Sequence, residues 1–109
     1  MITTLTLSTA ILVAQAAALP TSTRSGAQIV QKQCALCHGP GVGGAPRIGD
    51  RGAWNKRLSS GLDGLVRSAA IGKGGMPPRG GQSDLSESEL RAAVAHMLHA
   101  SGAAGGEDP

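Results

Sequence analysis

Cys34, Cys37 and His38 are the residues of this 109-residue sequence whose types and spacing can do chemistry. They form the pattern C-x-x-C-H, two thiols separated by two residues and followed at once by an imidazole. In this pattern the thiols bond to a haem as thioethers, and the adjacent imidazole reaches the iron from one face. The chain contains no other cysteine. The motif therefore predicts haem c attached through Cys34 and Cys37, with His38 as one iron ligand.

A haem iron has a second axial position, and Met76 is the candidate for it. Met76 stands in a Gly/Pro-rich stretch, where it has no helix face to pack on. Met97 instead falls on the apolar stripe of a predicted helix, where methionine is ordinary core. Ligation by His38 and Met76 leaves no open coordination position and raises the reduction potential. We therefore expect an electron carrier, not an enzyme.

Three further residues are expected near the cofactor. Pro46 has a carbonyl but no N–H, so it can accept the Nδ1 proton of His38 and fix that ring. Trp54, the single tryptophan in a chain without Phe or Tyr, is expected to pack against the last helix. Its indole N–H is a candidate donor to a haem propionate, with Arg47 supplying positive charge to the same group.

The elements that must position these residues are helices joined by glycine-rich loops. Apolar spacing and capping residues predict helices over residues 26–33, from Asp50 to near Gly61, over residues 62–71, and from the N-cap Ser86 to about residue 100. On the first helix, Ala27, Val30 and Cys34 are expected to face inward. We find no strand pattern or repeat. The prediction is a small all-α domain, residues 26–100, with about four helices around one haem.

The composition agrees with a cofactor at the centre of this domain. The length allows one domain, and 17 glycines leave few side chains to fill its interior. Aromatic side chains normally supply much of a small core. A covalently held haem would both cross-link the chain and fill the core of such a small domain.

The N-terminal residues 1–18 predict an export signal, and therefore a periplasmic protein. Residues 2–19 carry no charge, and residues 14–18 offer small-x-small cleavage sites, although the first positions lack the usual Lys or Arg. The alternative is an uncleaved membrane anchor, for which the polar residues in this stretch leave a marginal apolar length. Residues 19–25 are expected to be a lead-in, and residues 101–109 a disordered tail.

The charge distribution predicts a partner with an acidic docking face. The net charge is +3, and the segment from Arg47 to Arg79 holds seven basic residues against Asp50 and Asp63. A positive region attracts and steers an acidic redox protein, although a solvated surface without a partner is the simpler interpretation. Nucleic acid is not an expected partner, because the chain has neither a dense Lys/Arg run nor an aromatic stacking platform.

Three alternatives use the same residues. The two cysteines would also suit a thiol oxidoreductase, but that normally needs a βα context. A zinc site could combine Cys34 and Cys37 with His96 and His99, although two residues between the histidines is fewer than the usual three to five. The domain could also keep its haem as a cytochrome subunit of a larger dehydrogenase or oxidase.

The ordered set of motifs resembles the class I c-type cytochromes, and within them the cytochrome c5 group. The likeness extends from Gly26 to Leu98 and comprises C-A-L-C-H-G, G-A-P-R-I-G-D-R-G-A-W from Gly44, G-G-M-P-P-R-G-G from Gly74, and D-L-S-E-S-E-L-R-A-A-V from Asp84.

This resemblance implies axial ligation by His38 and Met76, with the Pro46 carbonyl as partner of His38. It also implies a perpendicular contact between the first and last helices at Gly26. Members usually place aromatic residues at that crossing, where this chain has Val30 and His96, and they often carry a second cysteine pair that is absent here. Neither difference involves the expected haem ligands.

Overall fold

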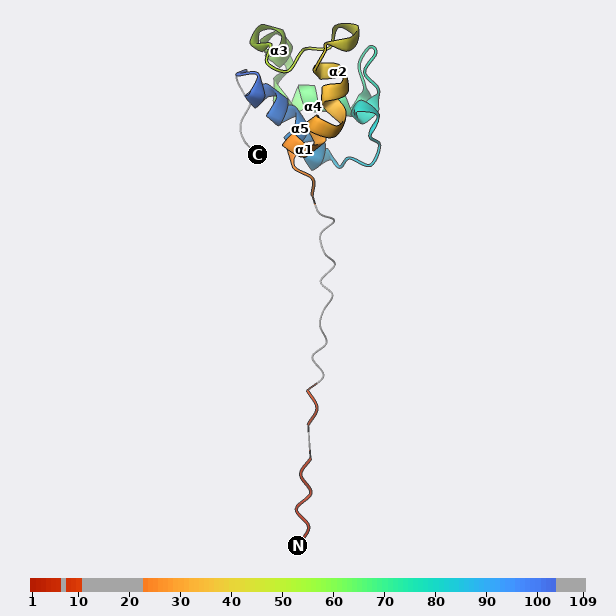
Figure 1. Ribbon diagram of the computed structural model, residues 1–109, viewed down its shortest axis with the longest axis vertical. Coiled ribbons are helices and arrows are strands. Elements are labelled where there is room, and N and C mark those ends of the chain that lie inside the picture. Colours follow the sequence, from red (N-terminus) through yellow and green to blue (C-terminus); the bar gives the residue numbers. More distant parts are fainter. Residues whose placement is uncertain (7, 11–22, 104–109) are drawn as a thin grey trace.

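The computed structural model describes residues 1–6, 8–10 and 23–103 (Figure 1). From residue 26 onward the described chain consists of helices and loops, with no β-strand in these ranges. Its elements are α1 (Gly26–Ile29), the π-helical turn η1 (Val30–Cys34), α2 (Ala35–His38), the 3-10 turn η2 (Val42–Gly44), α3 (Arg51–Arg57), the 3-10 turn η3 (Leu58–Ser60), α4 (Gly61–Ile71), the 3-10 turn η4 (Pro78–Gly81) and α5 (Glu87–Ala100). Because α1, η1 and α2 follow one another without a break, they form one helical stretch, and α3, α4 and α5 are the others. The predicted all-α fold with about four helices is therefore confirmed.

The helices begin where the polar residues of the sequence predict. The Ser25 hydroxyl accepts the Gln28 N–H at 3.1 Å, and the Gln28 side chain accepts the Ser25 N–H at 2.9 Å, which completes a capping box at α1. Ser86 and Glu89 form the same reciprocal pair at α5. Asp50 caps α3 by accepting a backbone N–H of its first turn at 3.0 Å. These bonds satisfy N–H groups that have no partner inside the helix.

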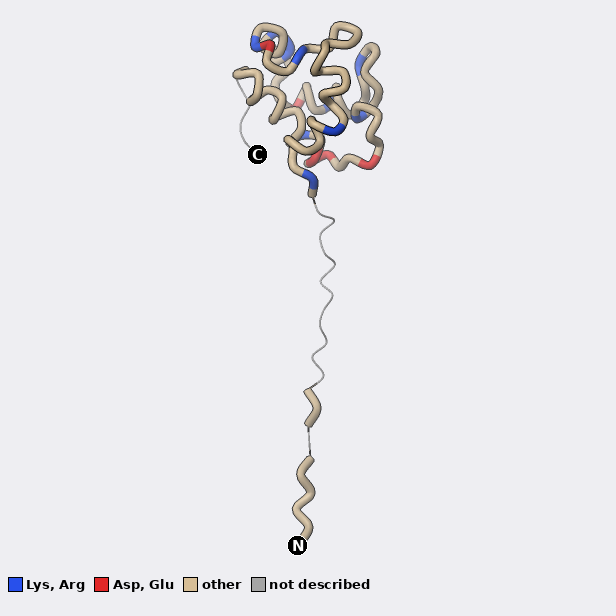
Figure 2. Tube along the Cα trace, in the orientation of Figure 1, with Lys and Arg blue, Asp and Glu red and all other residues tan. Residues whose placement is uncertain are grey.

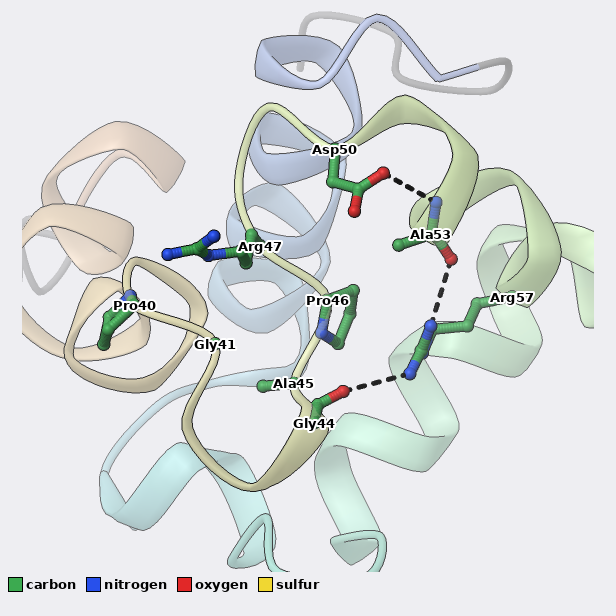
Figure 3. Close-up of a pocket in the computed structure, with 9 residues that line it drawn as sticks. All are labelled: Pro40, Gly41, Gly44, Ala45, Pro46, Arg47, Asp50, Ala53 and Arg57. Carbon is green, nitrogen blue, oxygen red and sulfur yellow. Dashed lines mark hydrogen bonds between the residues drawn. The ribbon is translucent and has the colours of Figure 1, made fainter.

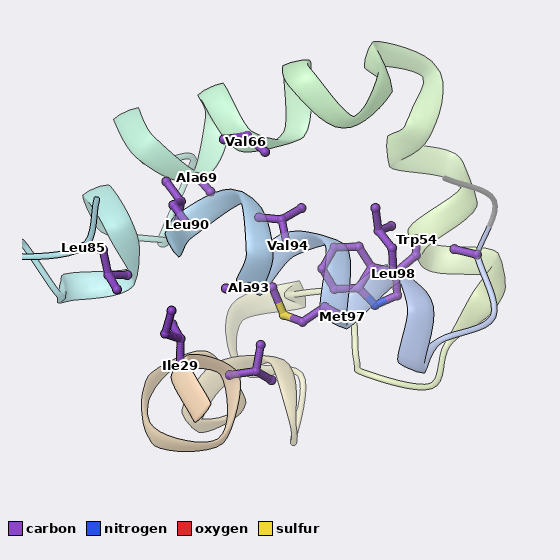
Figure 4. Close-up of a cluster of buried hydrophobic side chains, with 12 residues drawn as sticks. Ile29, Trp54, Val66, Ala69, Leu85, Leu90, Ala93, Val94, Met97 and Leu98 are labelled. Carbon is purple, nitrogen blue, oxygen red and sulfur yellow. The ribbon is translucent and has the colours of Figure 1, made fainter. Parts of the chain in front are cut away.

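The core lies around α5, which contacts α1 and α4 (Figure 4). Trp54 from α3 is 3% exposed and packs in the same cluster, and Met97 is 3% exposed. The predictions that these two side chains are core residues are therefore confirmed. The buried apolar residues also include Ile29, Val66, Ala69, Leu85, Leu90, Val94 and Leu98.

The contact between α1 and α5 depends on the absence of a side chain at Gly26. A Cβ at this position would lie 2.2 Å from the backbone oxygen of Ala92 and 2.6 Å from its carbonyl carbon. The two backbones therefore touch. The helix contact that the family resemblance implies at Gly26 is present.

The predicted inner face of the first helix is wrong at Ala27. That residue is exposed, whereas Gly26, Ile29 and Val30 are buried. Because Gly26 sets the face against α5, its neighbour Ala27 points elsewhere. The π-helical turn then adds a residue to one turn, so that a single 3.6-residue period cannot connect Ala27 with Cys34.

The predictions for the two chain ends fall largely outside the described residues, which omit residues 7, 11–22 and 104–109. Within the described ranges, no helix is long and apolar enough to span a bilayer. The disordered tail is a wrong prediction at its start, because Ser101 and Ala103 are buried. The Ser101 hydroxyl donates to the Met97 carbonyl at 2.7 Å and accepts the Gly49 N–H at 2.9 Å. It thereby ties the end of α5 to the loop before α3.

Arg24 and Glu89 connect the segment before α1 to the start of α5. Arg24 Nε donates to Glu89 Oε2 at 2.7 Å, and its Nη1 donates to Asp84 Oδ2 at 3.1 Å. The hydrogen bonds that Glu89 accepts from Arg24, with a further one from the Ser86 N–H, lower the pKa of Glu89 to about 2.

We expect Glu89→Gln to reduce the loss of stability in acid. Since the pKa of Glu89 is lower in the folded protein, its ionised form stabilises the fold above its ordinary pKa of 4.5. That contribution disappears as the pH falls from 4.5 towards 2. Glutamine keeps the capping box but not the charge. Urea unfolding of the variant should therefore depend less on pH in this window, whereas Glu87→Gln, at an exposed site on the same helix, should follow the wild type. Parallel curves for all three proteins would contradict this role.

Candidate functional site

The two cysteines and His38 lie on the continuous helical stretch formed by η1 and α2. Both cysteines are free thiols; Cys34 is half-buried and Cys37 is exposed. Burial raises the pKa of the Cys34 thiol. Reactive cysteines have lowered pKa values because the thiolate is the nucleophile. The environment of Cys34 therefore disfavours the thiol oxidoreductase alternative, and the all-α fold lacks the βα context that this alternative requires.

His38 is held in one orientation by the loop that follows it. Its ring is 8% exposed, and Nδ1 lies 2.8 Å from the carbonyl oxygen of Pro46. Because a carbonyl only accepts, this hydrogen bond assigns the proton to Nδ1 and leaves the lone pair of Nε2 for a metal. The backbone oxygen of His38 accepts the Ile48 N–H at 2.8 Å, a second tie to the same loop. The predicted contact between His38 and Pro46 is thus present.

Trp54 supports the same loop from the other side. Its ring centroid lies 5.5 Å from that of His38, with the planes tilted by 31°. The indole N–H donates to the backbone oxygen of Arg47 at 2.9 Å. The structure therefore gives this N–H a protein acceptor in place of the predicted propionate. Trp54 fixes the backbone directly after Pro46.

Arg47 itself is exposed and borders a hollow of about 400 Å³ (Figure 3). Arg57 crosses the wall of this hollow, donating to the Ala53 carbonyl at 3.1 Å and the Gly44 carbonyl at 3.4 Å. These bonds brace the loop against α3. The other lining residues are Pro40, Gly41, Ala45, Pro46 and Asp50.

Met76 lies in a tight turn after α4. Lys73 and Met76 exchange two backbone hydrogen bonds, of 3.0 and 2.9 Å, across two glycines. Gly72 permits this turn: its φ is +92°, and a Cβ there would lie 2.8 Å from the Met76 carbonyl oxygen. The Met76 side chain is half-buried against the core. The Met76 side chain thus comes from a loop that backbone hydrogen bonds hold in shape, and it is not part of the apolar face of a helix.

The donor set fits a haem. It comprises two thiols, an imidazole with its Nδ1 proton engaged, and a thioether, which are the groups that attach and ligate haem c. Half-buried apolar side chains border the core, as a flat apolar cofactor requires; they are Cys34, Ile48, Leu58, Leu62, Leu65, Ala70 and Met76. By contrast, no group of three or more His, Cys, Asp or Glu residues in the described ranges could hold a metal ion. The zinc alternative with His96 and His99 is therefore wrong.

Sequence reasoning missed three residues that shape this site. Gln33 donates to the backbone of the Met76 loop, Ile48 donates to His38, and Ser101 accepts from the neighbouring Gly49. Each acts on a partner distant in sequence or through its backbone, so no local motif indicates it.

Comparison with known proteins gives a consistent result. Residues 21–97 match the family model described as cytochrome c oxidase, cbb3-type, subunit III. The chain is 47% identical to cytochrome c5 of Ectopseudomonas mendocina over 76 residues, covering 68% of this chain and 87% of that protein. It is 45% identical to cytochrome c5 of Azotobacter vinelandii, covering 68% of this chain and 92% of the relative.

Solved structures show the same likeness. A chain from the crystal structure of an electron transfer complex of nitrite reductase with cytochrome c superposes with a TM-score of 0.66 at 45% identity, covering 70% of this chain and 93% of that one. A mono-haem ferrocytochrome c from Shewanella putrefaciens gives a TM-score of 0.62 at 36% identity, covering 68% and 91%. The helices, the C-x-x-C-H motif and these relationships agree: the chain belongs to the class I c-type cytochromes and is cytochrome c5-like.

Proposed function

We propose that this protein carries single electrons on one haem c whose iron is ligated by His38 and Met76. The observation that carries the proposal is the 2.8 Å contact between His38 Nδ1 and the Pro46 carbonyl beside the two free thiols. It selects the tautomer in which Nε2 can bind a metal. The bound haem supplies a reversible ferric–ferrous couple.

The chain's own residues attach the group and set its potential. Cys34 and Cys37 would hold the haem through thioethers, each the product of net addition of a thiol S–H across a vinyl group, so the attachment would need no oxidant. The Pro46 carbonyl increases the basicity of His38. The Met76 thioether would be the second protein ligand of the iron, and such ligation favours the ferrous state and would leave no position open for oxygen.

Trp54 and Arg47 support the cofactor on the side of His38. The indole packs on the imidazole and fixes the backbone at Arg47. The Arg47 guanidinium, which is exposed, supplies positive charge for a propionate. Next to His38, the chain thus offers the cofactor a charged group from Arg47 and a flat apolar surface from Trp54.

Redox proteins are the partners of such a carrier, and we propose that they dock through an acidic face. The exposed basic residues Arg47, Arg51, Lys56, Arg67 and Lys73 lie on α3, α4 and the adjoining loops (Figure 2). Opposite charge accelerates encounter, and salt screens it. Cys37 is exposed, which supports the proposal that electrons leave by the edge at which the haem is attached. The expected periplasmic location follows from the predicted export signal.

The test is expression in a host with haem-attachment machinery. We expect coloured protein whose haem survives acidic organic extraction and which takes up one electron reversibly in a redox titration. Cys34→Ala should mature poorly, because one thioether and much of the core's order are lost. A colourless protein with a cooperative unfolding transition and two titratable thiols would overturn the proposal.

The description of the matching family favours a second candidate, a cytochrome subunit of a larger oxidase. The site chemistry would be unchanged, but the protein would copurify with its complex. Native purification of the tagged protein from detergent-solubilised membranes separates the two possibilities, since a subunit brings the other polypeptides of its complex with it and a carrier is recovered alone.

A further inference from the structure

Gln33 connects the haem-attachment helix with the loop that carries Met76. Its side-chain Nε2 donates a hydrogen bond of 2.6 Å to the backbone oxygen of Gly80. Gln33 directly precedes Cys34, and Gly80 follows Met76 by four residues. The bond therefore joins the segment that attaches the cofactor to the segment that supplies its second axial ligand. Gln33 also lies in η1, a π-helical turn, and such turns are frequent at functional sites.

The other hydrogen bonds of this loop are local. Lys73 and Met76 bond to each other, the Gly80 N–H donates to Pro77, and Arg79 Nη1 donates to the Leu85 carbonyl at 3.1 Å. Among the described hydrogen bonds of residues 73–82, the one from Gln33 is the one that reaches a distant part of the fold. The local bonds fix the shape of the loop. Its position depends on packing against α4 and on Gln33.

The backbone after Met76 is shaped to receive this side chain. Arg79 has a φ of 54° and is the non-glycine residue with a left-handed backbone among those described; Gly80 follows with a φ of 62°. A non-glycine residue adopts this conformation only at an energetic cost. A Cβ at Gly81 would lie 3.5 Å from Gln33 Nε2, an ordinary contact distance, so the amide lies directly against this turn; the φ of 86° is what favours glycine at Gly81.

We propose that Gln33 is a positioning residue for Met76. Its hydrogen bond to Gly80 holds the loop against the attachment helix and keeps the thioether at the axial position. This inference rests on the axial role of Met76 proposed above. Without the bond, the loop retains its internal turns but moves away more readily, and an added ligand competes better for the iron.

The matched pair Gln33→Glu and Gln31→Glu tests this inference in the ferric holoprotein. Both changes add one negative charge to η1, but Gln31 is exposed and makes no comparable bond in the described structure. In Gln33→Glu the donor is lost and a carboxylate faces the Gly80 carbonyl. We expect imidazole to bind about fivefold more tightly than in wild type, the factor that corresponds to one net hydrogen bond. Gln31→Glu should bind imidazole like wild type. The added negative charge is common to both variants, so the midpoint potential of Gln33→Glu should be lower than that of Gln31→Glu.

Two parallel variants keep the test decisive. Gln33→Met removes the donor without adding charge, and it replaces Gln33→Glu if the latter fails to mature. Met76→Ala reports on the ligand itself. If Met76→Ala binds imidazole strongly while the Gln33 and Gln31 variants behave alike, Gln33 has no positioning role and the proposed ligation stands. If Met76→Ala also behaves like wild type, the axial assignment and the inference built on it both fail.

Discussion

Replacing Met76 by alanine should lower the midpoint potential of the holoprotein by more than about 0.1 V, within the roughly 0.8 V that axial ligands span. In the proposed ligation the thioether would stabilise the ferrous iron and fill its second axial position. Without it, water or an added ligand enters, and the ferric absorption spectrum should change from low-spin towards high-spin. A spectroscopic redox titration measures both effects in one experiment.

The control for this prediction uses Met97, the other methionine of the helical domain. Met76→Leu and Met97→Leu each replace a thioether by an apolar side chain of similar size. Met76 lies in a loop, whereas Met97 is buried in α5. Methionine-to-leucine exchange in a core costs less than about 1.5 kcal/mol. Met97→Leu should therefore keep the wild-type spectrum and potential. A wild-type potential in Met76→Leu, with no other ligand replacing the sulfur, would show that the iron is ligated elsewhere.

The proposed ligand residues could be selected from the sequence because their chemistry is local. Cys34, Cys37 and His38 are contiguous, and a C-x-x-C-H motif carries its own spacing. The contact with Pro46 could be predicted because proline has a backbone acceptor but no donor, and Pro46 follows His38 by eight residues of loop. The structure shows that contact at 2.8 Å. Where one or two residues determine the geometry, the sequence was sufficient.

The residues that hold the ligands in place could not be predicted in the same way. Gln33 and Ser101 are polar residues without a motif, and each bonds to a backbone atom 47 or 52 residues away. Ser101 also opens a run of small residues that resembles a tail. The indole of Trp54 has a single N–H, and sequence reasoning had no means to choose between a cofactor oxygen and the Arg47 carbonyl. Such choices are made by tertiary packing.

The inner face of the first helix was mispredicted for a related reason. Periodicity counts assume 3.6 residues per turn, and the π-helical turn from Val30 to Cys34 breaks that count just before the attachment motif. Gly26 is the better guide to this helix. It marks the point at which the backbone of α1 touches that of α5, a contact that is possible because glycine has no Cβ.

We expect Gly26→Ala to destabilise the protein by about 3 kcal/mol or more, and to lower its melting temperature by more than about 10 °C. The added Cβ would meet the Ala92 carbonyl oxygen at 2.2 Å and its carbon at 2.6 Å. Overpacking against a side chain is relieved by a rotamer change, but here the obstacle is the backbone of α5. The helices must separate, which exposes Ile29 and the core residues of α5 to water.

Gly52→Ala is the matched control, because it introduces the same methyl group into a helix with space around it. A Cβ there has one neighbour within 4 Å, the Asp50 carboxylate oxygen at 3.7 Å, an ordinary contact distance. Alanine has the higher helix propensity, so this variant should gain up to about 1 kcal/mol. Thermal unfolding of the two holoproteins should therefore move in opposite directions from wild type. Equal melting temperatures for Gly26→Ala and wild type would mean that the backbones of α1 and α5 do not touch at this residue. The orientation of the helix that carries the cysteines would then depend on other contacts.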